Sequence, residues 1–411
     1  MGITLLSKLV PVEDAREIIL AHIPVMGVEE VSLNDALGRV LAQEVVAPLP
    51  LPHWDNSSVD GYAVRAEDVS GASPENPREL RLMGQWPAGQ PGDQVVEPGA
   101  CLRVFTGSPL PQGADAVVMQ EDTRLVEDSA EARVWVCDKV RPFEHVRLAG
   151  EDIASGQQVL AQGRRLSGFD LGLVSALGIP RLKVRRVPRV GILATGTELV
   201  EPGQPLLPGQ IHESNRLLLR SLIQRSGATP VVFPLIADDL ERTTRCLEQA
   251  LDQCDVLLTS GGVSVGDHDH IKPALQALGG KIHLWRLAMK PGKPLVFAEA
   301  CHKPVFGLPG NPVSAVVGYS LLVYPALSQL AGCQTLDLPR ISGTLTQSIH
   351  NRGDRRLYVR VRLEGGGRVV PSQGHQGSHA LGSLATSDGL LAVAERTQLE
   401  AGSQVEVIGW P

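Results

Sequence analysis

The chain has 411 residues, of which 43% are hydrophobic and 20% charged, and its net charge is −7. A chain of this length exceeds what one hydrophobic core usually serves, so we expect two to four domains. The negative charge argues against nucleic acid or an anionic membrane as the main partner. Plentiful Gly (43) and Pro (30) beside few aromatic residues (4%) favour tight turns and short strands over helical bundles.

Cysteine usage and hydropathy indicate a reducing compartment. None of the six cysteines forms a C-x-x-C pair, so we expect free and mostly buried thiols. The N-terminal residues lack the pattern of a signal peptide, and no stretch of about 18 uninterrupted apolar residues occurs. We therefore expect a cytoplasmic protein without a membrane span.

The first 185 residues change pattern twice. Residues 12–45 carry two helical patterns, the second beginning at Ser32, and a further helical run spans 167–177. Between them, short β-like runs such as 102–105, 116–119 and 132–136 are separated by Gly and Pro. The simplest arrangement is a helical domain (1–52 and 147–185) that is split by an inserted β domain (53–146).

From residue 186 onward, strand-like runs alternate with helical stretches. Runs at 190–194, 230–236 and 256–259 are each followed by a helical pattern. This order is typical of a doubly wound, mostly parallel sheet covered on both faces, which predicts an α/β domain over 186–335. Alternating strands with Gly-rich turns then predict a C-terminal β barrel or sandwich over 336–411. The fold class is thus α/β and multidomain.

Five loops at one predicted end of the sheet carry glycine, acidic residues or lysine. Ligands of open α/β sheets bind beyond the carboxyl ends of the strands, so these loops predict a ligand site. Coincidence explains one such loop more easily than five. The loops are 195–198, 238–239, 260–269, 289–294 and 308–312.

Each loop also has a purely structural interpretation. The glycines of 260–266 allow backbone N–H groups to face an anion, yet the loop is neither a Walker nor a dinucleotide motif. Lys290 and Lys293 flank a Pro-Gly turn, which favours phosphate or oxyanion binding over an ordinary surface role. Segment 309–312 either presents Asn311 to a ligand or is a plain strand-to-helix turn.

Acidic residues provide the remaining signal. Glu198, Asp238 and Asp269 could each be an ordinary helix N-cap. Together beside lysines, they suit a site where Mg²⁺ is held against phosphate oxygens. His268 and His270 lack metal-ligand spacing and are interpreted as loop residues. The inserted domain adds polar turns at 55–63, 103–116 and 147–152.

These stretches, in this order, resemble the molybdopterin molybdenumtransferase family, which includes bacterial MoeA and the E domain of gephyrin. The resemblance covers essentially the whole chain. It implies an elongated homodimer whose subunit has a split helical domain, an inserted β domain, a molybdopterin-binding α/β domain and a C-terminal β barrel. Its most specific blocks are 55–63, 106–111, 113–121, 150–153, 195–200, 260–269, 290–294 and 307–315.

The resemblance also implies an activity, a cofactor and site residues. The family inserts molybdate into adenylylated molybdopterin and releases AMP with the help of Mg²⁺, forming molybdenum cofactor. Glu198, Asp238 and Asp269 are the expected metal ligands. Acids of the inserted domain are expected to complete the site of the opposite subunit. By position, the catalytic residues are Asp60, Thr106, Asp152, Glu198, Asp238, Asp269 and Lys290, and the substrate-binding residues are Ser260, Gly261, Gly262, Ser264, Gly266, Arg286, Lys293, Pro309, Gly310, Asn311, Pro312 and Ser378.

Arg286 departs from the family pattern, in which a lysine is expected. Arginine keeps the charge and its planar fork suits phosphate, but it does not release a proton as a lysine can. A role in proton transfer at this position is therefore not expected.

Three alternatives remain open at this stage. A molybdopterin adenylyltransferase resembles 186–332 alone, so the flanking regions argue against it. A gephyrin-like scaffold protein would not need the acids and lysines. A nucleotide pyrophosphatase would cleave dinucleotides without molybdate. The expected partners are the two substrates, a second subunit and, transiently, a molybdopterin adenylyltransferase and molybdoenzymes.

Overall fold

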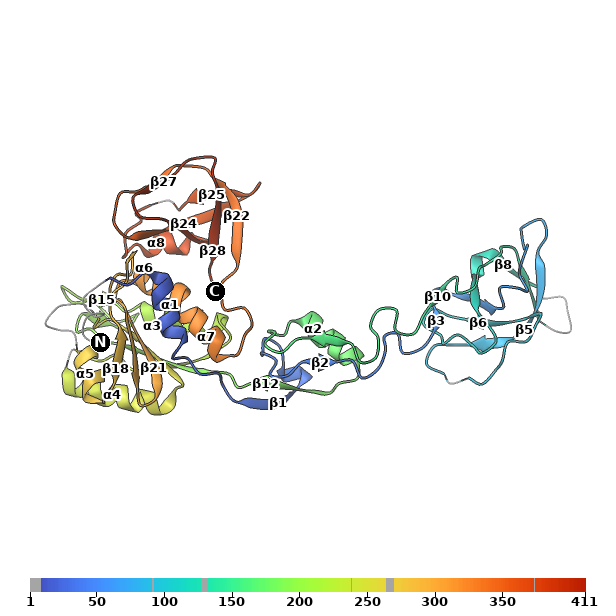
Figure 1. Ribbon diagram of the computed structural model, residues 1–411, viewed down its shortest axis with the longest axis horizontal. Coiled ribbons are helices and arrows are strands. Elements are labelled where there is room, and N and C mark those ends of the chain that lie inside the picture. The colour runs from blue at the N-terminus through green and yellow to red at the C-terminus, as the bar shows by residue number, and fades with distance from the viewer. Residues whose placement is uncertain (1–8, 91, 127–131, 238, 264–269, 373) are drawn as a thin grey trace. The chain divides into compact units, whose positions relative to one another are not determined.

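The computed structural model describes residues 9–90, 92–126, 132–237, 239–263, 270–372 and 374–411. The chain forms two compact units (Figure 1). Unit 1 comprises Met1–Ala42, Gln162–Ser167 and Arg181–Pro411, and unit 2 comprises Gln43–Ala161 and Gly168–Pro180.

Unit 1 contains the predicted α/β domain. Its six-stranded sheet has the order β16-β13-β17-β21-β20-β18. The first four of these strands run parallel, whereas β20 is antiparallel to both of its neighbours. The doubly wound, mostly parallel sheet is thus confirmed. Its strands are β13 (Arg189–Ala194), β16 (Thr229–Val232), β17 (Val256–Ser260), β18 (Lys281–Leu284), β20 (Val296–Ala300) and β21 (Lys303–Leu308).

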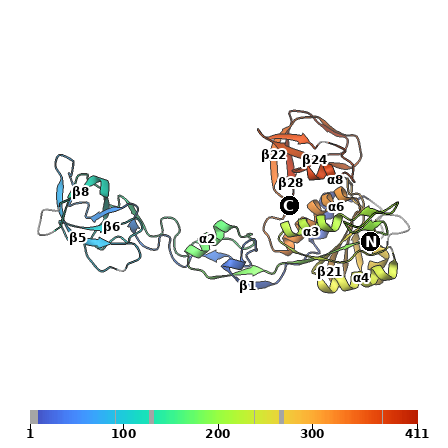
Figure 2. The ribbon, with the colours of Figure 1, turned by 180° about the vertical axis from the view of Figure 1, so that it is seen from behind.

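Helices cover both faces of this sheet (Figure 2). Ile19, Leu219 and Val316 pack in one apolar cluster against one face, and Leu247 and Leu275 belong to a second cluster with Leu193, Leu257 and Val305. Strand residues point alternately to the two faces, so neighbours such as Ile192 and Leu193 enter different cores. The helices are α1 (Val12–Leu20), α3 (Asn215–Arg225), α4 (Leu240–Gln253), α5 (Ile271–Ala277), α6 (Pro312–Gly318) and α7 (Tyr324–Leu330).

One helix, Pro312–Leu330, is apolar and long enough to cross a membrane, but 83% of its apolar window is buried inside the protein. It is therefore a core helix of the α/β domain. Its middle is a π-helical segment, η3 (Tyr319–Val323), just before Pro325. Proline lacks the N–H group that an α-helical turn requires, which accounts for the irregular turn.

Phe297 provides a test of this core. Its side chain is fully buried, and its ring lies 5.0 Å from that of Phe306. Phe297→Ala is expected to lower the free energy of unfolding by about 3–5 kcal/mol, because truncation leaves a cavity. Leu217→Ala, at an exposed position of α3, is the control and should change it by less than about 0.5 kcal/mol. Urea unfolding of both variants measures the difference, and equal midpoints would contradict this assignment of the core.

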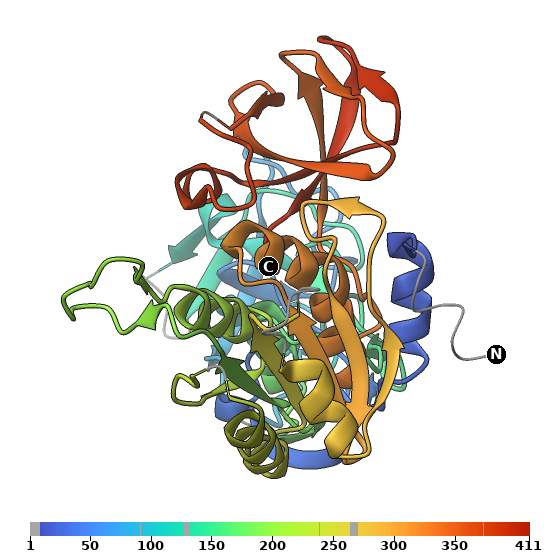
Figure 3. The same ribbon diagram turned by 90° about the vertical axis from the view of Figure 1, so that its left-hand side faces the viewer.

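The C-terminal region of unit 1, whose fold can be followed in Figure 3, is a closed five-stranded barrel by its strand pairing. β24 pairs with both β25 and β26, β22 pairs with β25 and β28, and β26 pairs with β28, so no strand edge is left open. Of the two predicted alternatives, barrel and sandwich, the strand pairing therefore confirms the barrel. Its strands are β22 (Arg340–Leu345), β24 (Arg356–Glu364), β25 (Arg368–Pro371), β26 (Gly389–Val393) and β28 (Gln404–Gly409), accompanied by β19 (Met289–Lys290), β23 (Ile349–Asn351), β27 (Thr397–Leu399) and α8 (Leu381–Ala385).

The predicted second helix near Ser32 is wrong. Only a short 3₁₀ turn, η1 (Leu33–Asp35), forms there, preceded by β1 (Val28–Ser32), which pairs with β12 (Arg181–Arg185). Gly38 has a φ of +74°, a conformation that ends a right-handed helix. The two other predicted helices of the first 185 residues are confirmed as α1 and α2 (Gly168–Ala176).

Unit 2 contains a six-stranded sheet with the order β7-β4-β6-β5-β9-β8. The short runs predicted at 102–105, 116–119 and 132–136 fall on β6, β7 and β9. A smaller part around Ala47, Ile153 and Leu177 packs α2 against its neighbours. The elements are β2 (Val45–Val46), β3 (Asn56–Ser57), β4 (Gly61–Val64), β5 (Arg78–Trp86), β6 (Ala100–Val104), β7 (Ala116–Met119), η2 (Gln120–Asp122), β8 (Thr123–Val126), β9 (Arg133–Val136), β10 (Val146–Arg147) and β11 (Gln158–Leu160).

Candidate functional site

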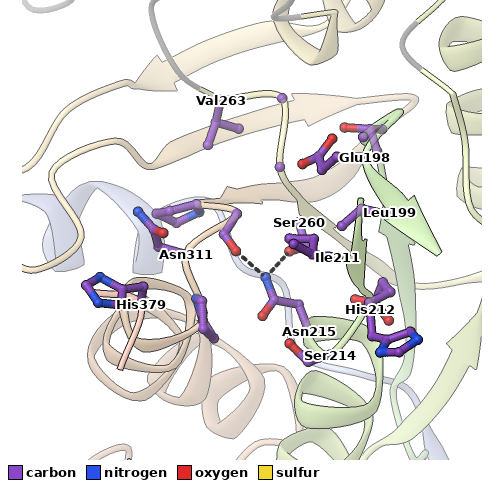
Figure 4. A pocket seen from close by; sticks show the side chains of 18 of the residues that line it. Glu198, Leu199, Ile211, His212, Ser214, Asn215, Ser260, Val263, Asn311 and His379 are labelled. Atoms are coloured by element: carbon purple, nitrogen blue, oxygen red, sulfur yellow. Dashed lines mark hydrogen bonds between the residues drawn. The ribbon is translucent and has the colours of Figure 1, made fainter. Parts of the chain in front are cut away.

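A cavity of about 710 Å³ lies beyond the carboxyl ends of β13, β17 and β21 (Figure 4). The three loops that follow these strands converge on it, because parallel strands end at one edge of the sheet. Eight of the residues singled out from the sequence line this one cavity. They are Glu198, Ser260, Gly261, Gly262, Pro309, Gly310, Asn311 and Pro312.

Two glycines follow β17 because the loop after β13 passes very close to the backbone at this point. Gly261 and Gly262 have φ values of +88° and +65°, which favour glycine. A Cβ atom on Gly261 would lie 2.6 Å from the backbone oxygen of Thr195. The N–H of Gly261 donates to the oxygen of Leu308, at 3.1 Å, which draws the loop after β17 toward the loop after β21.

Asn215, the first residue of α3, connects the loop after β17 with the loop after β21. Its Nδ2 donates to Ser260 Oγ (2.8 Å) and to the backbone oxygen of Gly310 (2.7 Å). The Gly310 oxygen can only accept, so it fixes the orientation of the amide. Asn215 is buried, and the spacing of the two loops therefore depends on it. Sequence analysis missed this residue, because an Asn at a helix start looks like any capping residue.

Pro312 is the first residue of α6 and Asn311 its N-cap. The segment is thus a strand-to-helix turn and a wall of the cavity at once. Further lining residues that sequence analysis did not single out are Ser214, His212 and Glu213 beside α3, and His379 from the barrel.

Glu198 is not a helix N-cap, because β14 (Leu199–Val200) follows it directly. Its carboxylate folds back over Gly196, where a Cβ atom would lie 2.7 Å from Glu198 Oε2. Asp239, by contrast, does cap α4, since its side chain accepts from the Arg242 N–H at 2.7 Å. The predicted residues Asp238, Ser264, Gly266 and Asp269 lie outside the described residues.

The predicted basic residues lie apart from the cavity lining. Lys290 and Lys293 are exposed, and the guanidinium of Arg286 lies 5.2 Å from the centre of the Trp285 ring. In the described part of the chain, none of these three lines the cavity, although Pro294 does. Ser378 is likewise absent from that lining, but its backbone oxygen accepts from the Val313 N–H (3.1 Å), beside the lining residue His379.

In unit 2, Asp60 and Thr106 form a pair. Asp60 Oδ1 accepts from the Thr106 N–H (2.7 Å) and from the Thr106 hydroxyl (2.9 Å). The Thr106 N–H and then its hydroxyl hold the pKa of Asp60 below its usual value, with a smaller contribution from Arg103. Asp60 is exposed and is a carboxylate at neutral pH. Asp152 is also exposed in unit 2, where its backbone N–H donates to the oxygen of Leu51 at 3.1 Å.

Fold and cavity together define a multidomain α/β protein with a cavity at the strand ends of its α/β domain and a C-terminal barrel. Three family models match: MoeA N-terminal region (domain I and II) over residues 10–178, probable molybdopterin binding domain over 191–329, and MoeA C-terminal region (domain IV) over 342–410.

Known proteins extend this likeness over nearly the whole chain. Molybdopterin molybdenumtransferase 2 of Mycobacterium tuberculosis (strain H37Rv) is 38% identical, covering 92% of this chain and 94% of its own. Molybdopterin molybdenumtransferase of Haemophilus influenzae is 34% identical, with 96% and 97% covered. The crystal structure of the molybdopterin biosynthesis MoeA protein of Pyrococcus horikoshii OT3 is similar with a TM-score of 0.84 at 31% identity, covering 97% and 99%. The chain belongs to the molybdopterin molybdenumtransferase (MoeA) family.

Proposed function

We propose that the chain inserts molybdate into adenylylated molybdopterin, releases AMP and so forms molybdenum cofactor. The observation that supports this most is the cavity itself. Its glycine and proline loops are held at a fixed spacing, in a chain whose similarity to curated molybdenumtransferases covers more than 90% of its length. Because the two MoeA models match on either side of the molybdopterin binding domain, a stand-alone adenylyltransferase and a scaffold protein are not favoured.

The cavity residues act by binding and orienting. Gly261 and Gly262 carry no side chain, so an anionic group can approach this stretch of backbone closely. Asn215 holds Ser260 and Gly310 close to each other through one shared donor nitrogen, which fixes the spacing of the two loops at the cavity. A fixed geometry of this kind lowers the entropic cost of bringing two reactants together. Lys290, Lys293 and Arg286 are not part of the described cavity lining, and their proposed role is to attract the two anionic substrates toward it by their positive charge.

Mg²⁺ would be held by Glu198, with Asp238 and Asp269 as its proposed partners. Among the described residues, no three His, Cys, Asp or Glu side chains are grouped to hold a metal. One or two carboxylates together with substrate phosphate oxygens are a usual environment for Mg²⁺, and Glu198 in the cavity fits it. The bound ion would polarise the phosphate linkage to AMP.

The proposed enzyme is a cytoplasmic homodimer. Asp60, Thr106 and Asp152 of unit 2 are proposed to act in the same reaction as the cavity residues, with a second subunit contributing the acids. Mixing Asp60→Ala chains with Asp269→Ala chains tests the proposal, because a shared site regains activity in the mixed dimer. Activity no higher than that of either variant alone would count against it.

The reaction itself is tested by mixing the purified chain with adenylylated molybdopterin, molybdate and Mg²⁺. We expect AMP release that depends on molybdate, together with a product that activates a molybdoenzyme lacking its cofactor. Formation of an AMP adduct from molybdopterin and ATP would instead indicate an adenylyltransferase. Cleavage of dinucleotides without molybdate would indicate a pyrophosphatase.

A further inference from the structure

One wall of the cavity is a small projecting segment, residues 199–212, which we call the side lobe (green in Figure 3). It begins with β14 and ends with β15 (Ile211–His212), and the two strands pair in parallel. The Ile211 N–H donates to the Glu198 oxygen, and the Glu213 N–H to the Val200 oxygen, both at 2.9 Å. Leu199, Ile211 and His212 face the cavity (Figure 4). Glu198 therefore stands at the root of the side lobe.

Arg216 ties the side lobe to the body of the domain. It lies in the first turn of α3, and only 8% of its surface is exposed. Its Nε donates to Glu213 Oε2 (3.2 Å), its Nη2 to Glu201 Oε1 (2.5 Å) and its Nη1 to the backbone oxygen of Phe233 (3.0 Å). Its backbone N–H donates to the second oxygen of Glu213 at 2.8 Å. One buried side chain thus joins the root of the lobe, a residue within it and the segment after β16.

Each bond in this cluster has a distinct consequence. Glu213 is buried, so Arg216 is needed to balance its charge. Glu201 is half exposed, and its ion pair with Arg216 reaches beyond the strand pair into the lobe. The planar guanidinium holds all three partners in one plane, which a lysine would not do. Arg216 itself is not among the described residues that line the cavity.

The geometry points to Arg216 as the positioning residue of this site, which acts through Glu201 and Glu213 to hold the side lobe and Glu198 in place. This inference rests on the proposed function for its effect on the reaction. It assigns to Arg216 no contact with the substrate. Small displacements of an active group lower the rate steeply, so a loosened lobe should reduce turnover more than substrate binding.

The test compares Glu201→Ala with Glu201→Gln, which keeps an acceptor for Arg216. The matched control is Glu241→Ala, an exposed acid of α4 whose ion pair with Arg245 is 3.6 Å long. For Glu201→Ala we expect kcat to fall about 10-fold, while KM changes less than about 2-fold. This variant should also need a higher Mg²⁺ concentration for half-maximal activity. In Glu201→Gln all three quantities should return toward the values of the parent protein.

Hydrogen exchange of residues 199–212 provides a readout that does not depend on activity. Glu201→Ala should speed exchange there about 10-fold while leaving the barrel strands unchanged, and Glu241→Ala should not. If Arg216→Met folds, we expect a larger fall in kcat and a larger increase in exchange rate than in Glu201→Ala. If it does not fold, the Glu201 variants alone test the role of Arg216. Parent-like exchange and kcat in Glu201→Ala would overturn the inference. An inactive parent protein would refute the proposed function, while the exchange result would still test the role of Arg216.

Discussion

Gly261→Ala is expected to weaken binding of AMP and of adenylylated molybdopterin by about 100-fold or more. The added Cβ atom would lie 2.6 Å from the backbone oxygen of Thr195, a contact that no side-chain rotation relieves. The loop after β17 must therefore shift, and with it Ser260, which accepts from Asn215. Isothermal titration calorimetry with AMP measures the loss.

Gly402→Ala is the matched control for this change. Gly402 has the same φ, +88°, but no atom lies within 4 Å of its added Cβ position. Both variants bear the cost of a left-handed alanine, about 1–2 kcal/mol, so only the clash distinguishes them. Equal affinities in the two variants would show that the close approach at Gly261 does not shape the ligand site.

Asp60→Ala is expected to lower the rate of AMP release by about 100-fold or more with little change in melting temperature. Asp60 is exposed, so its removal leaves no cavity, yet it orients both the N–H and the hydroxyl of Thr106. Glu67→Ala, an exposed acid of the same unit paired with Arg65, is the control. Loss of activity in proportion to a loss of folded protein would indicate a structural role instead.

The lowered pKa of Asp60 also fixes the sign of its pH dependence. Its ordinary value is 3.8, and the bonds from Thr106 move the folded value below that. The stabilising contribution of these bonds is present above 3.8 and is lost as the pH falls through the folded pKa. Activity of the parent protein should therefore not decline between pH 7 and pH 5 through titration of Asp60. Asp60→Asn, which keeps an acceptor without the charge, separates orientation from electrostatics.

The order of strands and helices in the α/β domain was predictable because each element has its own hydrophobic period. The position of the cavity followed from the rule that loops at strand ends converge, and Glu198, Gly261 and Asn311 line it together as that rule requires. The helix predicted near Ser32 was wrong. The apolar spacing of this segment fits a helix, but Gly38 and the pairing of β1 with β12 prevent one.

Residues whose role depends on contacts with distant parts of the chain could not be recognised from sequence patterns. Asn215 contacts Ser260 and Gly310, which are 45 and 95 positions away, and only the folded chain brings them together. In the sequence, Arg216 is not distinguishable from an ordinary polar residue of an amphipathic helix. Arg360 sits in a strand where an exposed charge is the usual expectation, yet it is fully buried and donates to Ser383 Oγ and to the His375 and Gly377 oxygens.

The central claim is that the cavity beyond β13, β17 and β21 holds the phosphate-bearing substrate. A crystal structure of the protein with adenylylated molybdopterin tests this most directly. We predict density for the ligand between the 260–263 loop and the 309–312 loop, with a phosphate oxygen within hydrogen-bond distance of a backbone N–H in one of them. Ordered ligand elsewhere, with this cavity filled by water alone, would contradict the account.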